Sequence, residues 1–345
     1  MTKLRLLFAA LWALLAISTA AESTRPNILL ITVDTFRPDH LGYYGYPLDG
    51  VVLTTGCDKT TPASLMAAAT VNIPAIVLSG GPMLDGSYKG KKAGSGTIIW
   101  EARKLHAKGE INYDEFMDMA AASAPSIGHC NTMGTASSMN SIAEALGMSL
   151  TGGAIIPAPY KERESISFET GKRIVKMVHE DLTPSKIMTK ESFENAIFVA
   201  SAIGASSNCP PHLTAIARHM GIDLDIENWE KLGHDIPLLV NCQPAGEHLM
   251  EGFFKAGGIP AIMQELMKNN KLHKNAMTVT GKTIRENLNT KIDVDEKVIK
   301  SYKNPLVQNA GFIVMKSNFF SSAVMKTSVI SEEFRKRYLS NPKNP

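Results

Sequence analysis

The chain has 345 residues, with 36 Lys and Arg against 33 Asp and Glu, and this net charge of +3 excludes strong electrostatic steering to nucleic acid. Four cysteines without a CxxC pair exclude a disulfide-rich scaffold and the spacing of a zinc finger. A content of 44% hydrophobic and 20% charged residues is typical of a globular protein, and the length predicts about two domains. No apolar run reaches the roughly 18 residues that a membrane span needs.

Residues 1–21 carry the three-part pattern of a secretory signal peptide. Lys3 and Arg5 give a positive start, an uncharged apolar stretch covers 6–17, and small residues follow at 18–21. The alternative is an amphipathic or core helix, but the apolar residues surround the axis instead of forming one stripe. The pattern therefore predicts export of the chain.

The next segment, residues 22–47, contains an apolar run that ends in Asp34. Such a run predicts a buried parallel strand with a carboxylate at its C-terminal end, where open α/β sheets bind ligands. The stretch RPNILLITVDTFRPDHLGYYGYP resembles the amino-terminal strand and loop of the sulfatase family, which implies that Asp34 would help to hold a calcium ion. The resemblance ends at Pro47, because the segment around Cys57 lacks the Pro and Arg of the sulfatase nucleophile motif.

From residue 48 onward, a series of blocks follows the order of a different family. They include LDGVVLTTGCDKTTPASLMAAATVNIPAIVLSGGPM, GHCNTMGTASSMNSIAEALGMSL, PSKIMTKESFENAI, LLVNCQPAGEHL and AVMKTSVISEEF. These blocks resemble the dihydroxy-acid dehydratase and 6-phosphogluconate dehydratase family over residues 48–345. The GHCNTMGT block resembles its sugar-acid branch. Measured against that family, we expect the opening segment to be missing and the chain to stop within a C-terminal β-domain.

Strands that alternate with helices over residues 48–300 predict an α/β fold in which a parallel sheet is flanked by helices. The resemblance makes this the dehydratase N-terminal domain, incomplete at its N-terminus. Over residues 301–345, short apolar runs without helices predict the truncated start of the C-terminal β-domain. The expected elements are strands at 51–53, 73–78 and 236–240 and helices at 61–69, 114–122, 135–146, 167–182, 190–202 and 259–268.

Cys57, Asp58 and Lys59 follow a predicted strand and open a predicted helix, a position that exposes side chains at the mouth of a site. Thiolate is a soft ligand suited to an iron–sulfur cluster, and carboxylate is a hard ligand suited to Mg²⁺. The resemblance implies that Cys57 binds a cluster, that Asp58 binds Mg²⁺ and that Lys59 binds it as a carbamate. Cys130, just before a second helix, would be another cluster ligand. Without the resemblance, the ordinary interpretation is a core thiol beside an exposed ion pair.

The resemblance implies a [2Fe–2S] cluster held by three cysteines, with [4Fe–4S] as the alternative. We expect the third cysteine in the missing opening segment. The proton-abstracting serine would lie beyond Pro345, so no catalytic base is identified in this chain. Cys209 and Cys242 are interpreted as core or loop thiols.

Other polar features have a plain interpretation beside a functional one. Glycine-rich turns at 79–81 and 204–208 could present backbone amides to a carboxylate, although such turns are common. The charged residues 161–164 are interpreted as a solvated face. The sequence predicts no partner for His129, His212 or His248.

The resemblance implies a hydro-lyase that dehydrates a 2,3-dihydroxy acid, such as an aldonate, to a 2-keto-3-deoxy acid, with activity impaired in this chain. A secreted sulfatase and a non-functional chimeric product are the alternatives. The expected partners are a small sugar-acid substrate and further copies of the chain, since the family forms homo-oligomers; no nucleic acid and no stable membrane span are expected. The dehydratase body predicts a cytoplasmic location, whereas the leader predicts export.

Overall fold

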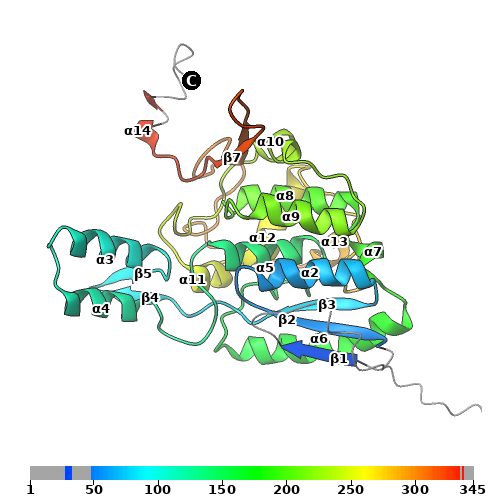
Figure 1. Cartoon of the computed structure of the whole chain (residues 1–345). Coiled ribbons are helices and arrows are strands. Elements are labelled where there is room, and N and C mark those ends of the chain that lie inside the picture. Colours follow the sequence, from blue (N-terminus) through cyan, green and yellow to red (C-terminus); the bar gives the residue numbers. More distant parts are fainter. Residues whose placement is uncertain (1–27, 33–47, 335, 338–345) are drawn as a thin grey trace, which may run out of the picture.

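The computed structural model describes residues 28–32, 48–334 and 336–337. Its centre is a parallel sheet with the strand order β1 (Ile28–Thr32), β2 (Gly50–Thr55) and β3 (Ala75–Ser79). In Figure 1 this sheet lies between α6 (Lys161–His179) on one face and α2 (Thr60–Val71) on the other. The apolar run of β2 is buried along nearly its whole length, as expected for a parallel strand that is covered on both faces.

Helices above α2 complete the main body. Helix α5 (Thr135–Ala145) packs against α2 and α8 (Lys190–Ala202), and every one of its residues is buried. Helix α9 (Cys209–His219) packs on α2, and α12 (Gly258–Lys268) packs on α5 and α8 (Figure 1). The shorter helices are α7 (Pro184–Ile187), α10 (Glu227–Gly233), α11 (Met250–Lys255), α13 (Ile284–Asn287) and α14 (Glu332–Phe334).

A small lobe extends from the left side of the body in Figure 1. It combines the antiparallel pair β4 (Gly86–Tyr88) and β5 (Lys91–Ala93) with α3 (Thr97–Ala107) and α4 (Tyr113–Ala122). Its own core is limited to a few side chains, namely Ala93, Ile98, Ala102 and Met119. Sequence analysis found only α4 here, because short hairpins and a helix with two buried positions leave a weak periodic signal.

Most of the predicted elements in the body are confirmed. The strands at 51–53 and 73–78 and the helices at 61–69, 114–122, 135–146, 190–202 and 259–268 correspond to β2, β3, α2, α4, α5, α8 and α12 within a few residues. The helix predicted at 167–182 begins six residues earlier, at Lys161. Together these elements confirm the α/β class with a small parallel sheet.

The strand predicted at 236–240 is wrong. This segment forms only isolated bridges, from Leu238 to Val307 and from Val240 to Ile299. Pro237 within it has no amide hydrogen to donate to a neighbouring strand, which weakens any regular ladder. The run nevertheless lies in the core, as its apolar character indicates.

The predicted β-character near the C-terminus is confirmed by the antiparallel pair β6 (Phe312–Met315) and β7 (Ala323–Lys326). The domain boundaries stay a prediction. At the other end, β1 confirms the strand that was predicted before Asp34. Asp34 itself, the signal pattern at 1–21 and the remainder of the sulfatase-like segment lie outside the described residues. Within the described ranges, no helix is long and apolar enough to cross a membrane.

Candidate active site

The carboxyl ends of β2 and β3 place two loops at the same edge of the sheet. Residues 56–59 follow β2 and lead into α2, and residues 80–83 follow β3. A third loop, residues 127–134, pairs with residues 81–83 through the His129 amide to Gly81 O at 3.0 Å and the Met83 amide to His129 O at 2.9 Å. Parallel strands thus bring the Cys57 loop and the Cys130 loop to one edge, where α/β folds bind ligands.

Both predicted cluster cysteines are free and exposed at this edge. Cys57 lies three residues before α2, and Cys130 lies five residues before α5. Asp58 is half-buried and Lys59 is exposed. Cys57 and Asp58 thus lie close to the N-terminus of α2, whereas Cys130 lies on the loop that leads into α5.

His129 contacts both cysteine loops. Its ring is buried, which lowers the pKa of the imidazole to about 4, so it is neutral near pH 7. Nδ1 lies 2.9 Å from Cys130 O, and a carbonyl oxygen only accepts, so Nδ1 carries the proton. Nε2 is then the acceptor and faces Asn140 Nδ2 at 3.5 Å. The ring also lies against Gly56, where an added Cβ would be 3.9 Å from His129 Cδ2.

The residue after Cys130 fixes the same loop on its other side. Asn131 is wholly buried; its Nδ2 donates to Leu84 O at 2.7 Å, and its Oδ1 accepts from the Ser95 amide at 2.9 Å. Its backbone oxygen accepts from the Met250 amide at 3.0 Å. The buried hydrogen bonds of Asn131 therefore hold the loop that carries the exposed Cys130.

Lys59 reaches across to α9, where its Nζ lies 3.1 Å from His212 Nε2. The pKa of His212 is lowered by partial burial and by the Lys59 ammonium, which favours the neutral ring. A protonated amine can only donate, so His212 Nε2 accepts in this pair. This contact supplies the partner that sequence analysis did not find for His212.

The two glycine-rich turns are occupied by their own hydrogen bonds. The Gly80 amide donates to Thr55 O at 2.6 Å, and the Gly81 amide donates to Ser79 Oγ at 3.2 Å. In the 204–208 turn, the Ser206 amide donates to Ser138 Oγ at 3.0 Å. The plain interpretation as structural turns therefore accounts for these amides, and the suggested carboxylate cradle is not supported.

Three of the four residues at 161–164 are exposed, as predicted for a solvated face, but Arg163 is not. Its side chain is buried and donates to Ser79 O at 2.6 Å, to Gly153 O at 2.9 Å and to Ile156 O through a short contact. The pKa of the guanidinium is lowered to about 10 by burial, and the group stays charged at neutral pH. A local charge pattern could not show this, because the carbonyls that Arg163 binds belong to the preceding loop and to the end of β3.

Glu144, on α5, is a second buried charged side chain. Its two carboxylate oxygens accept from the Gly152 amide at 2.7 Å and the Ala154 amide at 2.9 Å. Burial raises the pKa of this carboxyl to about 7, against the opposing effect of these amides and of Arg163. Glu144 and Arg163 thus support the loop at 149–156 beneath the site.

Cys209 and Cys242 are confirmed as core thiols. Both are buried and free. Burial raises the pKa of Cys209 to about 12 and raises that of Cys242 further. Such thiols are poor ligands and poor nucleophiles at neutral pH, so the cysteine chemistry of the chain is confined to Cys57 and Cys130.

The model of the family "Dihydroxy-acid/6-phosphogluconate dehydratase N-terminal" matches residues 40–287. The chain belongs to this dehydratase family. The match includes residues 40–47, which sequence analysis had placed in the sulfatase-like segment, and the sulfatase alternative gains no support.

Curated relatives agree with this membership. The chain is 58% identical over 299 residues to D-xylonate dehydratase of Caulobacter vibrioides, which covers 87% of this chain and 50% of that protein. It is 44% identical over 311 residues to L-arabinonate dehydratase of Rhizobium leguminosarum bv. trifolii, with 86% and 54% covered. Dihydroxy-acid dehydratase of Acetivibrio thermocellus is 39% identical over 289 residues, with 84% and 52% covered. The chain spans about half the length of these dehydratases.

The donor set of this dehydratase domain fits the implied groups as far as it extends. Two exposed thiols stand on adjoining loops, with a carboxylate and an amine directly after one of them. Within the described ranges, no group of three or more His, Cys, Asp or Glu side chains converges on one point. The described residues therefore have suitable donor types for these groups but, among themselves, not a complete ligand set.

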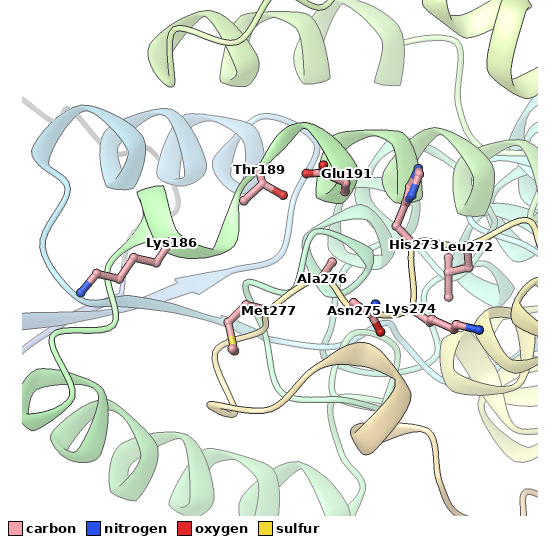
Figure 2. A pocket seen from close by; sticks show the side chains of 9 residues that line it. All are labelled: Lys186, Thr189, Glu191, Leu272, His273, Lys274, Asn275, Ala276 and Met277. Carbon is pink, nitrogen blue, oxygen red and sulfur yellow. The ribbon is translucent and has the colours of Figure 1, made fainter.

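A cavity of about 630 Å³ has no cysteine in its lining. Figure 2 shows the side chains that line it. Lys186, Glu191 and His273 are among the side chains that line it. The Ser185 amide, beside the cavity, donates to Asn72 Oδ1, and Asn72 is the C-cap of α2. Cys57 lies before the other end of this 12-residue helix, a length of about 18 Å. Because no cysteine lines the cavity, its size alone does not identify it as the candidate active site.

Proposed function

We propose that the chain forms the N-terminal part of a sugar-acid dehydratase, a hydro-lyase that converts a 2,3-dihydroxy acid to a 2-keto-3-deoxy acid and water. One observation carries the proposal: two exposed cysteines lie on neighbouring loops at the carboxyl edge of the sheet, and Asp58 and Lys59 directly follow one of them. The relatives named for D-xylonate and L-arabinonate support an aldonate as the substrate.

In this proposal Cys57 and Cys130 hold an iron–sulfur cluster of the [2Fe–2S] type, and Asp58 and Lys59, the latter as a carbamate, hold Mg²⁺. When bound, these groups would supply a Lewis-acidic iron for the leaving 3-hydroxyl and a cation for the carboxylate and 2-hydroxyl. The chain's own residues set the positions: His129 and Asn131 hold the Cys130 loop, and His212 Nε2 lies where it can accept a hydrogen bond from an N–H on Lys59 Nζ.

Iron binding tests the proposal more sharply than turnover, because the chain spans half the length of its relatives. The full chain is reconstituted anaerobically with iron and sulfide, and bound iron, bound sulfide and the visible absorption are measured. We expect Cys57→Ser and Cys130→Ser each to abolish stable cluster binding, whereas the matched control Cys209→Ala retains it. Iron content that is the same in all four proteins would refute the cluster assignment.

The substrate is tested with D-xylonate and L-arabinonate, in each case by following formation of the 2-keto-3-deoxy acid.

Asp58→Asn is expected to weaken binding of Mn²⁺, used as a paramagnetic substitute for Mg²⁺, because the neutral amide is a poorer ligand for a hard cation. Unchanged Mn²⁺ binding in this variant would remove Asp58 from the metal site.

A further inference from the structure

Asn140 is the buried polar side chain that connects the two cysteine loops most directly. It lies in the middle of α5, and 1% of its surface is exposed. Its Nδ2 donates to Gly56 O at 3.0 Å and to Ala136 O at 2.9 Å. Its Oδ1 accepts from Thr55 Oγ1 at 3.0 Å and from Thr61 Oγ1 at 3.4 Å.

These four contacts use the full hydrogen-bonding capacity of an asparagine amide, which has two donors and two acceptor lone pairs. An aspartate could not donate to Gly56 O, and a leucine of similar shape would leave the buried partners without a bond. Leaving such buried groups without a hydrogen bond destabilises the folded state. The residue type therefore matches this position in its chemistry as well as its size.

The partners of Asn140 are placed on both sides of Cys57. Thr55 and Gly56 come just before this cysteine, and Thr61 lies in the first turn of α2 just after it. On the other side, Asn140 Nδ2 faces His129 Nε2, and His129 Nδ1 donates to the backbone oxygen of Cys130. The Asn140 amide therefore holds the Cys57 loop directly, and it reaches the Cys130 loop through the longer His129 contact, in which one N–H is shared with a carbonyl oxygen.

We propose that Asn140 is a positioning residue that sets the separation of the Cys57 and Cys130 thiols. The inference rests on the proposed function, because a fixed separation of the two thiols matters only if they bind a cluster together. It concerns the geometry of the metal-free chain, and so it can be tested without iron.

The test uses phenylarsine oxide, which binds two neighbouring thiols together and releases water. We expect the full chain to bind one equivalent and Cys57→Ser or Cys130→Ser to bind none. In Asn140→Ala the affinity falls about tenfold, because the two loops are no longer held together. Thr55→Val, which removes one hydroxyl donor to Asn140, lowers the affinity in the same direction by less.

Asn195→Ala is the matched control. Asn195 is also a wholly buried helical asparagine with bonds to backbone, donating to His273 O at 3.1 Å and accepting from the His273 amide at 2.7 Å. Its loss destabilises the fold similarly but leaves arsenical affinity within about twofold of the wild type, since distant sites act independently. Thermal unfolding shows whether both variants are folded. Labelling with a reagent that modifies single thiols shows whether two cysteines remain accessible in each.

Wild-type arsenical affinity in Asn140→Ala, or an equal loss in Asn195→Ala, would overturn the positioning role. Failure of the proposed function gives a different result: the arsenical data follow the prediction, but the reconstituted wild-type chain holds no iron.

Discussion

The two ends of α2 present two polar regions that differ in how their polar groups are partnered. At its N-terminal end, buried amide and imidazole side chains hold two loops that expose cysteines. Near its C-terminal end, a cavity is lined by charged groups with local partners, such as Lys186 with Asp181 at 2.8 Å. The comparison teaches that a candidate site is identified by its exposed reactive side chains and by the buried hydrogen bonds that hold them in place. The volume of a cavity does not identify it.

The largest expected contrast is in thiol reactivity. Exposed Cys57 and Cys130 are expected to react with a reagent that modifies single thiols at least about a thousandfold faster than Cys209 and Cys242. The latter two are buried and react only after local unfolding. The measurement is the time course of thiol labelling, with all four thiols counted after unfolding. Cys57→Ser and Cys130→Ser should each remove one fast thiol. A third fast thiol in the folded chain would contradict the burial of the core cysteines.

Arg163→Met tests the support beneath the cysteine edge. The variant removes three hydrogen bonds to the buried carbonyls of Ser79, Gly153 and Ile156, and we expect a loss of about 4 kcal/mol in the free energy of unfolding. Denaturant titration measures it. Lys172→Met on the same helix is the control, because Lys172 pairs with Glu169 at 2.9 Å on the exposed side and its loss should cost below about 1 kcal/mol. Equal losses would show that Arg163 has no special structural role.

Glu144 gives this region a pH dependence. Its pKa is raised to about 7 in the folded chain from 4.5, so the folded state favours the neutral carboxyl. Its contribution to stability is complete below pH 4.5 and is lost as the pH rises to 7, by about 3 kcal/mol at 1.36 kcal/mol per unit. The measurement is the difference in unfolding free energy between wild type and Glu144→Gln from pH 4.5 to 8. This difference should shift in favour of the variant as the pH rises; a constant difference would rule out the raised pKa.

The smallest effect is expected at the cavity. His273→Ala removes the pair between His273 Nε2 and Glu194 Oε2 at 2.6 Å, but 40% of the histidine side chain is exposed, so we expect a loss below about 1 kcal/mol. Iron content after reconstitution should equal that of the wild type. If this variant lost iron as the cysteine variants do, the separation between the two regions would be wrong.

Several parts of the site could be predicted from local patterns. The apolar run of β2 followed by Cys57, Asp58 and Lys59 placed these residues at a strand end, and the helical spacing after Cys130 placed that cysteine before α5. Cys209 and Cys242 were interpreted as core or loop thiols, and both are buried. These predictions hold because strand and helix formation and the exposure of their ends depend mainly on neighbouring residues.

Asn140 and Arg163 could not be placed in the same way. Asn140 belongs to a polar stripe of α5, with Ser137, Ser141 and Glu144 at helical spacing, which suggests a solvent-facing side. The structure buries every residue of this helix, so its polar side chains need partners within the protein. Arg163 lies among charges that suggest a solvated surface. Its carbonyl partners lie seven to 84 residues away in sequence, and no local pattern encodes them.

By itself, the sequence determined the family, the α/β class, the order of the main elements and the identity of the exposed donors, because these follow from residue type and local periodicity. Only the tertiary structure decided which loops meet, which charges are buried and which side chains hold the cysteines. Those outcomes depend on hydrogen bonds between segments far apart in the chain, such as Asn140 to Gly56. They form only once the sheet and its covering helices have brought the loops together.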